Sequence, residues 1–190
     1  ESTATSTAFA ALIALSLPAL YIMLGGAWLL IKSEAELFHK AVNWCRRALL
    51  PMGFALLMVS IATPLVSAEI AARWFTLPNA IGLLPIPVTC LLVYGGIAWL
   101  LQRVDLLEAD YGWLVFAALV VICLMAAIGL AYSIYPDIII GRMTLWEAAA
   151  ASSSLWFIFW GVAVTLPLIG AYTVFVYRVF SGKATALSYE

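Results

Sequence analysis

The sequence predicts an all-α integral membrane protein with five transmembrane helices and a short amphipathic helix on the inner surface. Hydrophobic residues make up 66% of the 190 residues and charged residues only 10%, whereas about a quarter of a soluble domain is charged. Mean hydropathy is +1.09. Five apolar runs each reach the length of about 20 residues that a helix needs to cross a bilayer. They are too long, and alternate too little, for the strands of a membrane barrel.

The five spans are expected to form a single transmembrane bundle over residues 1–190. They lie near residues 8–31, 48–72, 81–101, 113–135 and 155–177. Several prolines occur in or beside the runs, where membrane helices tolerate them because neighbouring groups satisfy the freed backbone. These prolines predict kinks or unwound turns, and they are Pro18, Pro51, Pro64, Pro85, Pro87 and Pro167.

The loop 32–47 between the first two runs has a helical pattern of its own. Ser33 and Glu36 have the spacing of a capping box, in which each side chain satisfies a backbone N–H at a helix start. Apolar side chains then share one helical face, with polar ones opposite, which predicts a short amphipathic helix on the inner surface. It is either a connector at headgroup depth or a docking element. The apolar face comprises Leu37, Phe38, Ala41, Val42 and Cys45.

The last span is preceded by a second capping box, formed by Thr144 and Glu147. Pro136 helps to end the preceding helix, and no charged residue occurs over 155–177. A helix would therefore begin in the interface, with Trp146 at headgroup depth, before the chain crosses the membrane. On local physics alone, this is a well-capped transmembrane helix. A capping role explains Glu147 at least as well as a contact with another molecule does.

Basic residues are distributed unequally between the two sides of the predicted bundle. Because basic loops favour the cytoplasmic face, we expect the N-terminus outside and the C-terminus inside. The outer side has only Arg73 and Arg142. The residues that mark the inner side are Lys32, Lys40, Arg46, Arg47, Arg103, Arg178 and Lys183.

No catalytic, cofactor-binding or metal-binding residue is expected in this chain. His39 is the only histidine and lies in a surface loop, whereas haem iron needs an axial His, Met, Cys or Tyr ligand. The cysteines are far apart and have no metal spacing. Glu69 is expected to pair with Arg73 at the outer interface rather than to carry protons. A net charge of −1 indicates no nucleic-acid partner.

Two further patterns are the polar start of the sequence and an internal sequence likeness. It opens on a polar stretch without an initiating Met, which indicates a linker and a sequence belonging to a longer chain. The segments 25–32 and 95–103 resemble each other: each has two glycines, then a Trp and a cation at the inner interface. Either an old duplication of a helical hairpin or convergence on one interface solution explains this likeness.

Several short segments along the chain carry a family resemblance. In order, they are Gly26 to Leu29 with Lys32, Glu36 to His39, Gly129 with Ala131 and Pro136, Met143 to Ala148, Pro167 with Tyr172 and Thr173, and Tyr177 with Phe180, Gly182 and Lys183. Together they resemble subunit II of cytochrome bd-type quinol oxidases, including the cyanide-insensitive branch. The likeness is to the C-terminal half of that subunit and covers most of the chain, although 64–101 matches only in hydropathy.

The resemblance implies a haem-free scaffold subunit of a respiratory quinol:dioxygen oxidoreductase in a bacterial or archaeal cytoplasmic membrane. Subunit I would then carry the b- and d-type haems and the quinol site. The family's first helical bundle is missing here, so a separate chain could carry it. The resemblance also allows a sheltered lipid or structural quinone. The residues expected to contact the partner, a quinone or a lipid are Trp146, Glu147, Glu36 and His39.

A second hypothesis comes from a different class of protein. The chain could be a stand-alone permease or assembly factor without a redox role that shares only hydropathy with the oxidase subunit. A transporter usually keeps an ionisable residue at membrane depth, and none lies near the middle of these runs. Haem absorbance that co-purifies with the chain would favour the oxidase hypothesis.

Overall fold

The computed structural model describes residues 3–66, 68–77, 79–139 and 142–183. The chain falls into two compact units, which divide between Tyr135 and Pro136. The helices of the first unit are α1 (Thr3–Lys32), α2 (Ala35–Val66), α3 (Ala68–Phe75), α4 (Asn79–Leu83), α5 (Pro85–Gln102), α6 (Val104–Leu106), the π-helical turn η1 (Leu107–Tyr111) and α7 (Gly112–Ile134).

The prediction of an all-α membrane protein with five spans is confirmed. Five helical segments of the described chain are long and apolar enough to cross a membrane. They correspond in order to the five apolar runs of the sequence. Their bounds are Thr7–Lys32, Ala35–Leu65, Asn79–Gln102, Val104–Ile134 and Ser152–Val179.

The second span differs most from its predicted bounds, because α2 begins at Ala35 and runs without interruption to Val66. The helix expected over 32–47, with one apolar face, does form from Ala35 on, but it is not separate: it is the first part of α2. Its apolar face, including Phe38, Ala41 and Cys45, is buried in the core. Packing against α1 thus removes from the interface the face that the sequence assigned to lipid headgroups.

Prolines shape the third span more than the others. α4 ends at Leu83, and α5 begins with Pro85 in its first turn. Proline is favoured there because its missing N–H would have no partner within the helix. Pro136 has the opposite effect at the end of α7, since residues before proline prefer extended backbone. Tyr135 is indeed extended, with φ −57° and ψ 137°.

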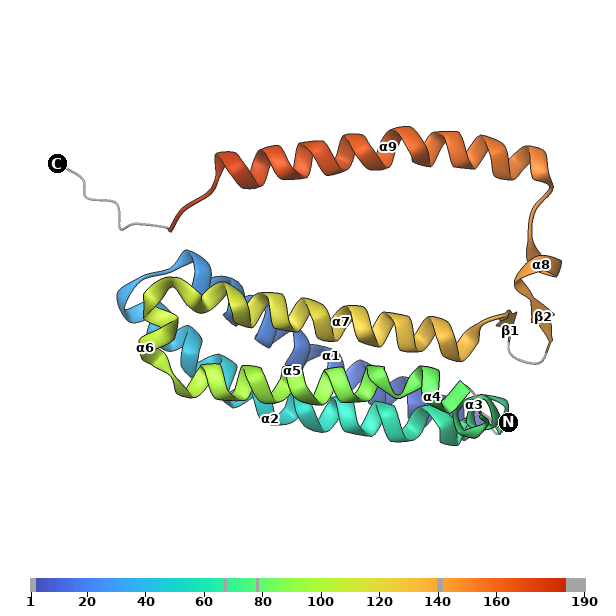
Figure 1. Ribbon diagram of the computed structural model, residues 1–190, viewed down its shortest axis with the longest axis horizontal. Helices are drawn as coiled ribbons and strands as arrows, with labels where there is room; N and C mark the ends of the chain where they lie inside the picture. Colours follow the sequence, from blue (N-terminus) through green and yellow to red (C-terminus); the bar gives the residue numbers. More distant parts are fainter. Residues whose placement is uncertain (1–2, 67, 78, 140–141, 184–190) are drawn as a thin grey trace. The chain divides into compact units, whose positions relative to one another are not determined.

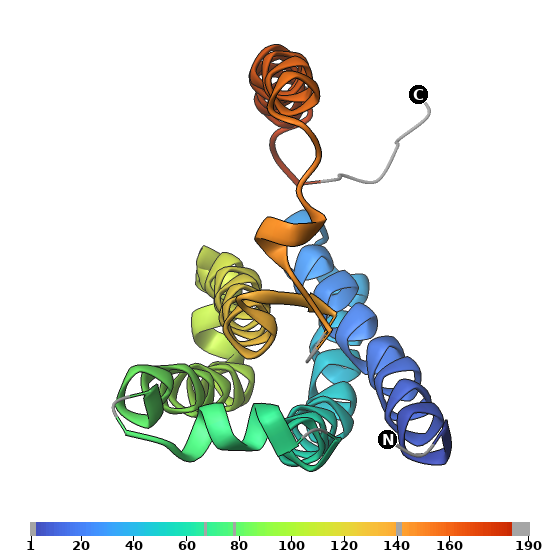
Figure 2. The same cartoon turned by 90° about the vertical axis from the view of Figure 1, so that its right-hand side faces the viewer.

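The first unit consists of two antiparallel hairpins, α1–α2 and α5–α7, packed against each other. Both connections within the hairpins lie at the same end, while α3 and α4 lie at the other (Figure 1). Figure 2 shows α3 crossing that other end between α2 and α4. The core runs along all four helices, and its most enclosed side chains include Met23, Cys45, Met52, Ile97, Leu101, Val115, Leu119 and Ile122.

One short β-ribbon and two helices make up the described part of the second unit. The antiparallel strands β1 (Asp137–Ile139) and β2 (Met143–Thr144) precede α8 (Leu145–Ala148), and α9 (Ser152–Val179) follows. The Leu145 N–H donates to the Pro136 carbonyl at 2.8 Å, which fixes the start of α8 to the start of the unit. A single bundle over all 190 residues stays a prediction.

Candidate functional site

Charged side chains gather at the end of the first unit where the two hairpin connections lie. On α2, Lys40 Nζ and Glu36 Oε1 are 2.6 Å apart, one helical turn from each other. His39 Nε2 lies 3.7 Å from Glu108 Oε1 of η1. All four side chains are exposed, so these pairs contribute little stability. Of the two, the His39–Glu108 pair connects the start of α2 with the α5–α7 connection.

The predicted capping box of Ser33 and Glu36 is not formed among the described contacts. The Ser33 hydroxyl is buried and donates to the Leu29 carbonyl at 2.6 Å. Ser33 therefore caps the C-terminal end of α1 rather than the start of α2. The Glu36 carboxylate pairs with Lys40 instead. The motif is misleading because Ala35, with φ 51°, turns the chain sharply between the two residues.

A partly buried hydrogen bond also joins the two hairpins at this end. Arg46 Nε of α2 donates to the Leu101 carbonyl near the end of α5, at 2.8 Å. A cation at a helix C-terminus is favourable because the last carbonyls carry partial negative charge.

Each hairpin also has a cation stacked on an indole ring near its connection. Lys32 Nζ lies 5.7 Å from the centre of the Trp28 ring in α1. Directly after α5, the Arg103 guanidinium lies 5.9 Å from the centre of the Trp99 ring of α5. Cation–π contacts of this length are attractive, and the amphipathic Trp is typical of the membrane–water interface. The two segments that resemble each other in sequence therefore share a Trp–cation pair, although only Gly26 of their glycines packs closely against a neighbouring helix.

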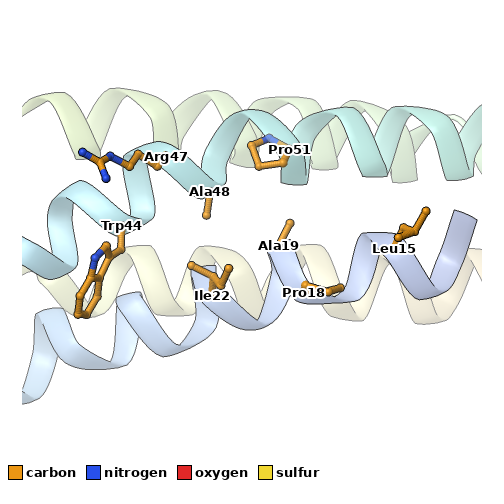
Figure 3. Close-up of a pocket in the computed structure, with 8 residues that line it drawn as sticks. All are labelled: Leu15, Pro18, Ala19, Ile22, Trp44, Arg47, Ala48 and Pro51. Atoms are coloured by element: carbon orange, nitrogen blue, oxygen red, sulfur yellow. The ribbon is translucent and has the colours of Figure 1, made fainter.

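A groove opens on the first unit between α1 and α2, with a volume of about 410 Å³. Figure 3 shows Arg47 and Trp44 at one end of it and Leu15 at the other. Most of the wall is apolar, as in small-molecule sites. The eight residues that line it are Leu15, Pro18, Ala19, Ile22, Trp44, Arg47, Ala48 and Pro51.

In the second unit, the predicted capping box of Thr144 and Glu147 is confirmed. The Thr144 N–H donates to Glu147 Oε2 at 2.9 Å, and the Glu147 N–H donates to Thr144 Oγ1 at 3.3 Å. The backbone hydrogen bond from Thr144, followed by the one from its side chain, lowers the pKa of Glu147 below its ordinary value. Trp146 is exposed beside this cap. Glu147 is therefore ionised and engaged at neutral pH.

Aromatic side chains cluster on the first turns of α9. The rings of Trp156 and Trp160 stack with centres 6.4 Å apart, and Phe159 contacts both rings edge-on. Such a cluster is typical of the membrane–water interface, and it places the start of α9 near headgroup depth.

The four predicted contact residues form two separate pairs. Glu36 and His39 lie within one turn of α2, while Trp146 and Glu147 are neighbours on α8. Their role as contacts to a partner, a quinone or a lipid stays a prediction. The predicted pair of Glu69 and Arg73 lies outside the described residues, because it depends on the Arg73 side chain.

The absence of a haem ligand from this chain stays a prediction. The only histidine, His39, is exposed and lies beside Glu108, and the side chains of Met23 and Met52 are enclosed by the helix packing. Within the described ranges, no three His, Cys, Asp or Glu residues are grouped as metal ligands. The α1–α2 groove, by contrast, is lined mainly by apolar side chains.

Sequence reasoning missed three features: Glu108 as the partner of His39, Arg46 as the cap of α5, and the groove. Of these three, only the groove has a signal in the sequence, because Pro18 and Pro51, which line it, are predicted kink sites. The contacts of Glu108 and Arg46 depend on how the hairpins pack, which no local pattern reveals.

The five membrane-spanning helices and the interfacial Trp–cation pairs define a multi-pass membrane protein. Residues 2–180 match the profile of the family described as cytochrome bd terminal oxidase subunit II. The match extends over nearly the whole chain, and the chain belongs to this family. No curated protein sequence matches it significantly. The family is part of a quinol oxidase complex, so a partner subunit I is implied.

Proposed function

We propose that this chain is the haem-free scaffold of a cytochrome bd-type quinol:dioxygen oxidoreductase, corresponding to the C-terminal part of subunit II. Subunit I would hold the b- and d-type haems and oxidise quinol, and this chain would stabilise it in a bacterial or archaeal cytoplasmic membrane. The observation that carries the proposal is the family match over residues 2–180.

The surroundings of the ionisable side chains support a structural role. The His39, Glu36 and Glu147 side chains each have a partner on the surface of their own unit, namely Glu108, Lys40 and Thr144. The His39–Glu108 pair links α2 to η1, the Glu36–Lys40 pair lies within α2, and Glu147 caps the start of α8, so each contact is of a structural kind. A molecule sheltered by the chain, either a lipid or a structural quinone, would have the α1–α2 groove available.

The cap of α8 offers a direct test. We expect Glu147→Ala to lower the yield of the purified complex more than its turnover per haem, because the variant loses the bond that starts α8. Haem absorbance per mole of this chain measures yield, and quinol-dependent oxygen uptake per haem measures turnover.

Glu147→Gln is the matched control, because Gln can also accept the Thr144 hydrogen bond in a capping box. It should restore most of the yield. An unchanged yield with lost turnover in the alanine variant would contradict the structural role of Glu147.

The competing hypothesis is a stand-alone permease or assembly factor. Purification of the chain from its native membrane separates the two hypotheses. Haem absorbance and a second, haem-bearing chain should co-elute if the scaffold proposal holds. A colourless, monodisperse oligomer of this chain alone would support the alternative.

A further inference from the structure

We propose that the groove between α1 and α2 binds an anionic phospholipid, with one acyl chain along the groove and the phosphate at Arg47. The inference rests on the proposed membrane placement but not on the scaffold role. It assigns a ligand class and an anchoring residue to one surface of the first unit.

The shape of the groove suits a chain molecule. The two alanines that line it, Ala19 and Ala48, are nearly buried, whereas Leu15 and Ile22 are exposed at its edges. Small side chains at the helix contact leave a channel between larger ones. From residue 15 to residue 22 the groove follows α1 for about 10 Å, since a helix rises about 1.5 Å per residue. Its volume of about 410 Å³ lies within the range of ligand sites.

The positive charge of Arg47 at one end of the groove favours an anionic lipid headgroup. Arg47 lies beside Trp44 at the end that we place toward the inner surface (Figure 3). The two neighbouring cations of α2 are engaged, Arg46 by the Leu101 carbonyl and Lys40 by Glu36. Within the described ranges, the Arg47 guanidinium has no hydrogen bond or ion pair. It is therefore the cation available to a ligand.

An anionic phospholipid fits these features better than a quinone does. A guanidinium binds phosphate through two parallel hydrogen bonds, whereas a quinone headgroup carries no charge to match it. Basic pockets between membrane helices on the cytoplasmic side are recurrent sites for anionic headgroups. Trp44 adds an amphipathic ring at the same depth. With one available cation at the groove, a phospholipid with a single phosphate is the matched ligand.

The test is lipid retention by the purified complex, measured by native mass spectrometry. The delipidated complex is exposed to equimolar phosphatidylglycerol and phosphatidylcholine. Arg47→Gln removes the charge and keeps the groove, whereas Ile22→Trp fills the groove and keeps the charge. The matched controls are Arg178→Gln, an exposed arginine on α9, and Ile61→Trp, an exposed isoleucine on α2 outside the groove.

We expect the unaltered complex to retain phosphatidylglycerol preferentially, and both controls to behave like it. Arg47→Gln should lose about fivefold in this preference, the effect of removing one cation near an anionic headgroup. Ile22→Trp should reduce retention of both lipids at this site. Co-purification of haem should not change in either groove variant, which separates this result from a failure of the scaffold proposal.

Equal phosphatidylglycerol preference in Arg47→Gln and in the unaltered complex would overturn the assignment. A second readout addresses a protein occupant. A photo-crosslinking amino acid at position 22 should react with lipid in native membranes. Efficient crosslinking to another polypeptide instead would show that a helix covers the groove, and the lipid proposal would fail.

Discussion

Arg46 and Arg47 are adjacent on α2, but they have different surroundings. The Arg46 side chain bonds the last turn of α5, whereas Arg47 lies at the end of the groove. Sequence alone treats them as two equivalent basic residues of the inner surface. The direction of each side chain follows from the packing of the hairpins, so only the structure separates their roles.

This difference predicts unequal effects on stability. Arg46→Gln should lower the free energy of unfolding by about 1 kcal/mol, because the α5 carbonyl loses a charged donor and the favourable charge at the helix end. The thermal midpoint of the complex in lipid-free detergent measures the loss. Arg47→Gln is the control and should leave the midpoint unchanged. Equal midpoints for the two variants would contradict the capping role of Arg46.

Two glycines also show what residue-level reasoning can supply. A Cβ at Gly26 would lie 2.5 Å from Cys45 Sγ, and one at Gly53 would overlap the Tyr94 hydroxyl. The Tyr94 hydroxyl in turn donates to the Leu49 carbonyl at 3.0 Å. The close approach of two helices at Gly26 could be predicted from the sequence, because paired glycines indicate such an approach. The second was not, since its position depends on the register between α2 and α5.

At the scale of elements, the two predicted capping boxes had opposite outcomes. Thr144 and Glu147 follow an extended segment, with Thr144 at ψ 160°, which is the backbone that a capping residue needs. Ser33 directly follows the last turn of α1 and bonds back to Leu29. The same spacing therefore forms a box only where no preceding helix competes for the hydroxyl.

The α8 cap predicts a pH dependence with a defined sign. The Thr144 hydrogen bonds hold the pKa of Glu147 below its unfolded value, which is about 4.3. The stabilisation is therefore complete above about pH 4.3 and is lost as pH falls through the lowered pKa. Amide hydrogen exchange over 144–148 should accelerate in acid relative to Glu147→Gln, which cannot titrate.

The comparison is made as a ratio of exchange rates at each pH, so that the intrinsic pH dependence of exchange cancels. The ratio of unaltered chain to Glu147→Gln should be lowest at neutral pH and should rise as Glu147 is protonated. A ratio independent of pH would show that the carboxylate does not stabilise the start of α8.

At the scale of the whole molecule, the structure groups several basic residues at one end of the first unit, but it does not show which side of the membrane that end faces. Lys32 ends α1 and Arg103 follows α5, so both are at hairpin connections, and Arg46 contacts Leu101 in the last turn of α5. Both connections lie at the same end of the first unit (Figure 1). The positive-inside rule assigns that end to the cytoplasm. The orientation with the N-terminus outside therefore stays a prediction.

Inserted protease sites would measure this orientation. A site beside Glu34 should be cleaved in inside-out vesicles, and a site beside Leu77 should be cleaved only in right-side-out vesicles. The two vesicle types serve as each other's control. The reverse pattern would place the basic end outside.

Much of the fold was predictable because apolar length is a strong signal. The fourth span, predicted at 113–135, agrees with α7 (Gly112–Ile134) to one residue at each end, although the whole apolar helical segment begins earlier, at Val104. The second span was misplaced at its start, because the sequence pattern over 32–47 describes an amphipathic surface equally well whether lipid or a neighbouring helix covers it. The β-ribbon at Asp137 was missed because its strands are too short for an alternation pattern.

The enclosure of Cys45 has a practical consequence for labelling chemistry. Its Sγ is packed against Gly26. The other two thiols, Cys90 and Cys123, are partly exposed but belong to the membrane-spanning helices α5 and α7. Water-borne maleimides should therefore react slowly with all three. A single cysteine engineered at an aqueous position would then carry a fluorophore or spin probe without prior removal of the natural sulfhydryls.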